Sequence, residues 1–468
     1  MVFSSCTFLF LFLPAVLGIY ACVDAKYRNF VLLAASLLFY GFGEPRYICI
    51  IGFVIIATYG GALLVEKYDG RMKKVLLALM ICVDLSFLIY FKYTNFILEN
   101  IAAVFQHKAD FIHVVMPIGI SFYTFQAISY LVDVYRKEVP AQKKLYDLAL
   151  YIVLFPQLVA GPIVKYHDVI KELEKRDFIF DDLLAGTQRF ILGLGKKVII
   201  ANSCGAIADA VFGTAVEQLG VGTAWLGAVA YSIQLYYDFS GYSDMAIGLG
   251  LMFGFRFKEN FNYPYESRSI TEFWRRWHIS LSTWFKEYLY IPLGGNRVSK
   301  ARNLLNLFIV FLVTGIWHGA AWTFVFWGLL HGAAILFEKI TSWHKAGSTL
   351  IIRLVQRIYT LLIVIFAWVL FRADSLAYAK KFILKMLGLY HSGAATFSIF
   401  FKVNIWELAI LVIAMIFSVS FLREKMQRFA EGKVAVYALY NAYLLICFML
   451  SAALIASSTY NPFLYFRF

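Results

Sequence analysis

Two short segments of the sequence hold the residue types best suited to chemistry, and each contains a histidine. Residues 274–278 read WRRWH, and residues 317–319 read WHG. The second histidine, His318, lies in a run from 303 to 337 that holds no Lys, Arg, Asp or Glu. Ionisable groups at membrane depth are costly and usually mark a pathway or a reaction site. The setting of His318 therefore indicates chemistry inside a bilayer.

The run around His318 is too long for a single perpendicular span. At about 1.5 Å per residue it would extend about 50 Å, against a hydrocarbon core of about 30 Å. A break near Gly315–Gly319 is predicted, which would place His318 near mid-depth at a cavity. Burial favours the neutral imidazole, and a neutral imidazole with a free nitrogen can act as a general base. The alternative is a histidine that bonds to a neighbouring helix without doing chemistry.

The segment around His278 is expected to form an interfacial helix. Ser269 and Glu272 have the spacing of a capping box, which predicts a helix that starts near residue 270. A loop follows at 292–296. One face of the helix would carry Trp274, Trp277 and Leu281, with His278 beside them, and other faces would carry Arg275, Arg276 and Lys286.

His278 admits two interpretations of equal weight. Its neighbouring arginines suit a phosphate and its neighbouring tryptophans offer stacking faces, so the segment could bind an anionic, planar ligand. Alternatively, the same side chains could anchor an amphipathic helix to lipid headgroups.

The remaining histidines are expected to be structural. His331 would face nearly the opposite side from His318 even in one continuous helix, and it is predicted to lie near the membrane edge. The others are predicted to be solvated in loops or at helix ends: His107, His113, His167, His344 and His391.

A polar seam around Asp238 and Asp244 lies within an otherwise apolar stretch. Carboxylates at membrane depth need partners. The sequence offers hydroxyl donors nearby and, for ion pairs, Arg275, Arg276 or Lys286. A structural polar network is as consistent with this pattern as contact with a substrate.

The composition is that of an integral membrane protein. Of the 468 residues, 61% are hydrophobic and 15% are charged, whereas a soluble domain is about 45–50% apolar and about 25% charged. The net charge of +14 comes from basic residues between apolar spans, which indicates topology and anionic headgroups rather than nucleic acid. The six cysteines form no CxxC pair, and no disulfide, metal site or tightly bound cofactor is expected.

Apolar runs predict a polytopic all-α protein with about ten to twelve membrane helices in a single domain, 1–468. An interrupted run at 148–164 predicts a re-entrant segment or a broken helix. Basic residues at 23–29 and 66–74 place these connections in the cytoplasm and the N-terminus outside. The predicted spans are 5–22, 30–43, 47–65, 75–91, 114–132, 183–213, 221–255, 303–337, 350–371, 404–422 and 434–457.

Seven segments carry a family resemblance: 1–5 with 8–10, 121–126, 155–162, 237–244, 273–282, 315–319 and 463–468. Together they resemble the membrane-bound O-acyltransferase family. The resemblance covers nearly the whole chain and is closest to the bacterial branch that supplies acetyl groups to alginate, peptidoglycan and other exported polysaccharides.

The resemblance implies roles for both histidines. His318 matches the family's catalytic histidine, and His278 matches its second signature histidine, near the thioester arm of the donor. The implied fold is a ring of tilted helices around a central tunnel, with re-entrant or interfacial pieces. The implied donor is acetyl-CoA, and the implied partner is an extracytoplasmic serine-hydrolase-like protein that modifies an exported polysaccharide. The implied location is the bacterial cell (inner) membrane.

These implications predict a mechanism and a donor site. His318 would take the proton of an acceptor hydroxyl as the oxygen attacks the thioester carbonyl. His278 would orient the thioester or stabilise the oxyanion. The predicted substrate- and donor-binding residues are Trp274, Arg275, Arg276, Trp277, Lys286, Gln234, Tyr237, Asp238, Ser240, Asp244, Asn296, Arg297 and Trp317.

Two other functions stay open at this point. One is transfer of D-alanine from a carrier protein to teichoic acid, by a relative that shares the histidine core. The other is a polysaccharide transporter or flippase, a class that usually has repeated halves, and no such repeat is evident in the sequence.

Overall fold

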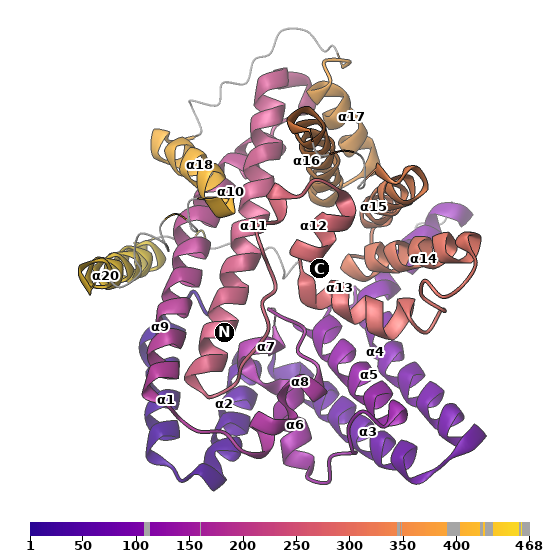
Figure 1. Ribbon diagram of the computed structural model, residues 1–468, viewed down its shortest axis with the longest axis vertical. Coiled ribbons are helices and arrows are strands. Elements are labelled where there is room, and N and C mark those ends of the chain that lie inside the picture. The colour runs from indigo at the N-terminus through magenta and orange to yellow at the C-terminus, as the bar shows by residue number, and fades with distance from the viewer. Residues whose placement is uncertain are drawn as a thin grey trace. The chain divides into compact units, whose positions relative to one another are not determined.

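The structure, a computed structural model, is built from helices and their connections (Figure 1). It describes residues 1–106, 113–159, 161–343, 347, 349–390, 403–421, 425, 434–457 and 460. No strand occurs among these residues, which confirms the predicted all-α class.

The chain folds into two compact units, which are described separately. Unit 1 comprises Met1–Phe190 and Ser243–Glu259, and unit 2 comprises Ile191–Tyr242 and Asn260–Phe468. The boundary falls inside two helices, α9 (Phe180–Gly195) and α11 (Val221–Met252), so each of these helices contributes residues to both units.

Unit 1 follows the apolar runs of the first third of the sequence. Its helices α3, α4 and α5 pack against one another (Figure 1). The helices of unit 1 are η1 (Phe8–Phe12), α1 (Leu13–Cys22), η2 (Ala25–Tyr27), α2 (Arg28–Gly43), η3 (Pro45–Tyr47), α3 (Ile48–Lys67), α4 (Gly70–Phe105), α5 (Ile120–Arg136), α6 (Leu145–Val153), α7 (Phe155–Leu158), α8 (Tyr166–Glu174), the first part of α9 and the last part of α11.

Two features of unit 1 bear on the predicted spans. The run 148–164 is indeed a broken helix, because Leu154 is not helical and α7 restarts with Pro156 in its first turn. Helix α4 continues well beyond the predicted span 75–91. Its continuation buries Lys92, whose ammonium donates to the Ser121 hydroxyl at 3.2 Å.

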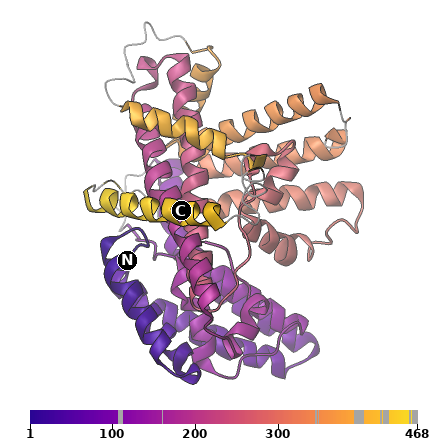
Figure 2. The same cartoon turned by 60° about the vertical axis from the view of Figure 1, so that its left-hand side comes forward.

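Unit 2 contains both histidine segments. Helices α14, α15 and α16 pack in succession and are seen as adjacent helices in Figure 2. The helices of unit 2 are the last part of α9, η4 (Lys196–Ala201), α10 (Asn202–Phe212), η5 (Val216–Gln218), the first part of α11, η6 (Pro264–Glu266), α12 (Ile270–Arg276), α13 (Ile279–Phe285), η7 (Lys286–Tyr290), α14 (Lys300–His318), α15 (Trp322–Thr341), α16 (Leu350–Arg372), α17 (Leu376–Met386), α18 (Ile405–Phe417) and α20 (Val434–Ser457).

Several of these helices are suited to a bilayer. Within the described ranges, seven helices are long and apolar enough to cross a membrane, and two more apolar helices are shorter. The predicted polytopic character is therefore confirmed. The number of ten to twelve spans, the outward N-terminus and the ring around a tunnel stay predictions.

Candidate active site

His318 lies at the end of α14, at the break before α15. The break predicted near Gly315–Gly319 is confirmed, because α15 begins only at Trp322. The two helices touch through small residues: a Cβ added to Gly315 would lie 3.0 Å from the Gly328 Cα. Such close contact needs glycine on both helices. It brings the buried His318 ring against the side chain of Trp327.

Aromatic rings surround the imidazole of His318. The ring centroids of Trp317, Trp327 and Phe371 lie 5.0, 4.8 and 5.5 Å from that of His318. Apolar surroundings favour the uncharged form of an imidazole over the imidazolium. This setting suits the proton-accepting role that the sequence predicts.

His331 lies in the interior of unit 2, and its predicted place near a membrane edge stays a prediction. Its side chain is 0% exposed. Its Nδ1 accepts a hydrogen bond from the indole N–H of Trp274 at 3.3 Å, and its ring stacks on Phe273 with centroids 6.1 Å apart. Helical periodicity could not reveal this burial, because it results from the packing of α12 on α15.

The single helix predicted from residue 270 consists of two helices. The predicted start is confirmed, because the Ser269 hydroxyl accepts from the Glu272 N–H at 3.0 Å. However, α12 ends before His278 and α13 begins after it. His278 itself has a left-handed backbone with φ 45° and ψ 56°. That conformation is uncommon for a residue other than glycine and persists only where the surroundings hold it.

Asn260 holds His278 in this conformation. Its backbone oxygen accepts from the Ile279 N–H at 2.9 Å, and its Oδ1 lies 3.2 Å from Nδ1 of His278. The Ser280 N–H also donates to Oδ1, at 3.0 Å, which fixes that atom as the amide oxygen. In the neutral ring, Nδ1 of His278 therefore carries the proton and Nε2 carries the lone pair.

The surroundings of His278 keep its ring uncharged. The side chain is 0% exposed, and burial lowers its pKa to about 3. The Phe239 ring packs edge-on against it, with centroids 4.6 Å apart. His278 is thus a neutral imidazole of defined tautomer. The sequence identified this residue, but it gave no sign that Asn260 would be its partner.

One aromatic cluster of unit 2 contains the neighbours of both signature histidines. Trp327 packs on His318, and its ring centroid lies 6.0 Å from that of Trp368. The ring centroid of Trp368 in turn lies 4.9 Å from that of Trp277. Trp277 directly precedes His278 in the chain. The two histidines therefore border the same hydrophobic core.

The predicted donor-binding residues divide by burial. The buried ones are Trp274, Trp277, Trp317, Gln234, Tyr237, Asp238, Ser240 and Asp244. The exposed ones are Arg275, Lys286, Asn296 and Arg297. The side chains of this exposed group form no hydrogen bond or ion pair with other described residues.

Two of the predicted residues already have protein partners. Arg276 forms ion pairs with Glu272 at 3.0 Å and with Glu266 at 3.7 Å. The Tyr237 hydroxyl donates to the Ala414 carbonyl at 3.0 Å. Arg276 would therefore have to exchange acidic partners to bind a phosphate.

The ion-pair partners predicted for Asp238 and Asp244 are wrong. In unit 2, Asp238 pairs with the buried Lys197 at 2.8 Å. In unit 1, Asp244 pairs with Arg189 at 2.6 Å. The only sequence signal for these partners was the presence of basic residues inside the apolar run 183–213. Lys197 lies in η4, a π-helical segment, and such segments are frequent at functional sites.

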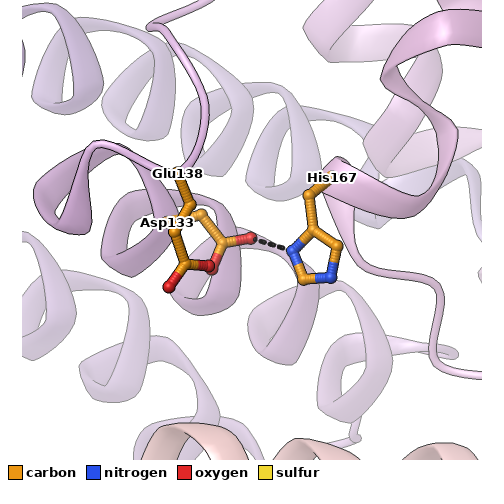
Figure 3. A group of neighbouring side chains, drawn as sticks. All are labelled: Asp133, Glu138 and His167. Carbon is orange, nitrogen blue, oxygen red and sulfur yellow. Dashed lines mark hydrogen bonds and ion pairs between the residues drawn. The ribbon is translucent and has the colours of Figure 1, made fainter.

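His167 is half-buried in unit 1, so its predicted solvation is wrong. Its Nδ1 lies 2.8 Å from Asp133 Oδ2 (Figure 3). Its Nε2 lies 3.3 Å from Asp168 Oδ1. Hydrogen bonds to Asp133 and then Asp168 raise its pKa to about 9. Asp133, Glu138 and His167 each place one ligand atom within 4.8 Å of the others, close enough to hold a metal ion.

The other loop histidines add little to the site. His113 is exposed, as predicted. His107, His344 and His391 lie outside the described residues, as does the C-terminal signature at 463–468.

Comparison with known proteins identifies the family. Residues 101–379 match the membrane-bound O-acyltransferase family. The chain is 46% identical to a probable alginate O-acetylase of Azotobacter vinelandii over 81% of this chain and 77% of that protein. It is 40% identical to a probable alginate O-acetylase of Pseudomonas putida over 100% of both chains. It is 37% identical to a peptidoglycan O-acetyltransferase of Helicobacter pylori over 83% of this chain and 80% of that one.

The chain therefore belongs to the membrane-bound O-acyltransferase family. It is a multi-pass membrane protein. Its activity is that of an O-acyltransferase.

Proposed function

We propose that this chain passes an acetyl group from a cytosolic thioester, acetyl-CoA, to an extracytoplasmic hydroxyl for the O-acetylation of an exported polysaccharide. The receiving hydroxyl belongs to a serine-hydrolase-like partner protein or to the polysaccharide itself. Relatives that the chain matches over three quarters or more of their length support the acetyl group, because they are named as O-acetylases of alginate and peptidoglycan.

The observation that carries the chemistry is the setting of His318. It is a buried imidazole at a helix break, among aromatic rings, in a stretch with no Lys, Arg, Asp or Glu from 303 to 337. Burying a polar imidazole in such a setting costs free energy, and ionisable residues at membrane depth usually mark functional sites. General-base catalysis is the role of His318 in this proposal.

The proposed reaction is acyl transfer with proton return. A nitrogen of His318 takes the proton of the acceptor hydroxyl while the oxygen attacks the thioester carbonyl carbon. The new C–O bond gives a tetrahedral intermediate whose oxygen carries the negative charge. The C–S bond then breaks, and the imidazolium returns its proton to the leaving thiolate. The products are an acetyl ester and a free thiol, and no group is oxidised or reduced.

His278 acts on the donor as a hydrogen-bond acceptor in this proposal. Its Nδ1 proton faces Asn260, so Nε2 is the hydrogen-bond acceptor of the ring rather than a donor. A neutral ring of this tautomer cannot donate to an oxyanion. It can instead accept from an N–H or O–H of the donor's arm and so align the thioester.

Proteoliposomes that contain the purified chain test the proposed donor. They would receive either [14C]acetyl-CoA or a carrier protein charged with labelled D-alanine, with a cell-envelope extract as the source of acceptors. We expect hydroxylamine-labile label from acetyl-CoA and background label from the carrier. Label from the carrier alone would contradict the proposal, as would uptake of a fluorescent polysaccharide without any ester formed.

A further inference from the structure

Two arginines of unit 1 converge on one aromatic ring without an acidic partner. Arg28 begins α2, and Arg176 follows α8. Their guanidinium carbons lie 5.2 and 5.7 Å from the ring centroid of Tyr20. Burial, together with the nearby charge of Arg28, lowers the pKa of Arg176. Neither guanidinium forms an ion pair with a carboxylate of the described residues.

Each of these guanidinium groups has a buried N–H that bonds to no described residue. These atoms are Nε of Arg28 and Nη2 of Arg176. The rest of Arg176 is held by neutral acceptors: its Nε donates to the Tyr20 hydroxyl at 2.9 Å and to the Phe253 carbonyl at 3.0 Å, and its Nη1 donates to the Asn29 amide oxygen at 2.5 Å. Arg176 is therefore fixed in place, and neither guanidinium has a carboxylate of the described residues in contact.

The surrounding chain is shaped to hold Arg176. Its guanidinium lies 4.5 Å from the ring centroid of Phe255. Gly254, with φ +82°, lets the backbone pass so closely that an added Cβ would lie 3.3 Å from the Arg176 Cδ and 2.9 Å from the Asp177 carbonyl oxygen. This conformation favours glycine. The position of Arg176 is thus built into the fold and is not a chance surface rotamer.

The start of α2 adds to the positive character of the site. Arg28 opens this 16-residue helix, whose N-cap Tyr27 makes no side-chain cap and whose first turn holds no acidic residue. A helix N-terminus attracts anions through its dipole. The acidic residue nearest in the network, Asp147, is occupied by the Asn29 amide at 2.6 Å.

We propose that Arg28 and Arg176 bind one phosphate group. Guanidinium groups match phosphate oxygens with paired N–H donors, and aromatic neighbours suit the planar cations. The phosphate would come from an anionic phospholipid headgroup or from the phosphates of CoA. Both occur on the cytoplasmic side, where the residues 23–29 are predicted to lie. The lipid source is independent of the proposed function, whereas the CoA source rests on it.

The test uses the full-length protein in two binding measurements. The first counts phosphatidylglycerol molecules retained by the protein in native mass spectrometry. The second measures CoA binding calorimetrically in nanodiscs of neutral phosphatidylcholine. Arg28→Gln is the principal variant, because the Arg28 guanidinium donates no hydrogen bond to a described residue, so its loss breaks none of these bonds. Lys26→Gln in the same connection is the matched control, since it removes an exposed charge outside the pair.

We expect Arg28→Gln and Arg176→Gln each to weaken phosphate binding by about tenfold or more in one of the two measurements, because each removes charge-assisted hydrogen bonds. Lys26→Gln should bind as the wild type does. The phosphate affinity of Arg28→Lys should lie between those of the wild type and Arg28→Gln, since lysine keeps the charge but lacks the paired N–H donors of the guanidinium. An effect confined to phosphatidylglycerol assigns the lipid source and would persist even if acetyl transfer were disproved. An effect confined to CoA assigns the donor. Wild-type binding by Arg28→Gln in both measurements would overturn the proposal.

Discussion

Histidines of the two units show how their surroundings set the charge of the same side chain. In unit 2, His278 faces aromatic rings and the neutral amide of Asn260, and burial lowers its pKa to about 3. In unit 1, His167 lies between Asp133 and Asp168, which raise its pKa to about 9. At neutral pH the first ring is neutral and the second is protonated. Only an uncharged imidazole can accept a proton, so the neutral setting of His278 suits the proposed chemistry, whereas the acidic setting of His167 favours an ion pair.

The largest effect should come from breaking the buried ion pair of unit 2. Lys197→Met would leave Asp238 buried without its cation and should lower the free energy of unfolding by about 3–5 kcal/mol. Denaturation in mixed detergent micelles measures this change. The double variant Lys197→Met, Asp238→Leu should recover most of the loss, because it removes both charges. Wild-type stability of the single variant would show that the interior of unit 2 tolerates a lone charge. That result would weaken the argument that this interior keeps its histidines neutral, in contrast to His167 of unit 1.

Substitution of Asn260 should change the hydrogen bonding and the pKa of His278, and an acidic replacement should make its surroundings resemble those of His167. Asn260→Leu removes the acceptor that fixes the tautomer of His278, and we expect a loss of activity of about 10–100-fold, the range known for hydrogen bonds that orient metal-binding histidines. Asn260→Asp keeps the acceptor but adds a charge, which should raise the pKa of His278 by about 1–3 units.

The pH dependence of kcat for acetyl transfer separates these two outcomes. In Asn260→Asp the acid limb of the profile should move to higher pH, because His278 must lose its proton to accept a hydrogen bond. In Asn260→Leu the rate should fall at every pH. A wild-type profile for both variants would show that Asn260 has no influence on the reaction.

His167 should affect stability and leave the reaction unchanged. Folding raises the pKa of His167 from 6.5 to about 9, so the folded state binds the proton more tightly. Its contribution is complete below the unfolded value and is lost as pH rises through the folded value. His167→Gln should therefore cost on the order of 1–2 kcal/mol near pH 6 and nothing near pH 10. Melting temperatures at both pH values measure this, and an equal loss at both would contradict the ion-pair account.

The smallest effect is expected from metal removal. The group of Asp133, Glu138 and His167 has the spacing of a metal site. However, the His167 ring is protonated at neutral pH, and this proton competes with a metal ion for the ring nitrogen. A chelator should therefore shift the melting temperature by less than about 1 °C. A drop of several degrees, with stoichiometric metal found by elemental analysis, would instead establish a metal centre.

The parts of the site that depend on local sequence could be predicted. The helix break at His318 follows from a run too long for one span and from its glycines. The start of α12 follows from the Ser269 cap, whose bond to Glu272 spans only three residues. Both features depend on contacts within one or two turns, which the sequence displays directly.

The parts that depend on tertiary packing could not be predicted. Asp238 pairs with Lys197 of an earlier segment. It does not pair with the arginines at 275–276, which are slightly nearer to it in the sequence. Asn260, which holds His278, is 18 residues away from it in the sequence. Nothing in the local pattern around either residue indicates which distant side chain the fold brings into contact.

The most direct test of the account compares His318→Gln with His167→Gln in one acetyl-transfer assay, at equal amounts of protein in the membrane. General-base catalysis contributes about 10²–10⁴-fold, so we expect His318→Gln to lose activity by that factor while His167→Gln stays within about twofold of the wild type. Wild-type acetyl transfer by His318→Gln would contradict the central claim that the neutral imidazole of unit 2 performs the reaction.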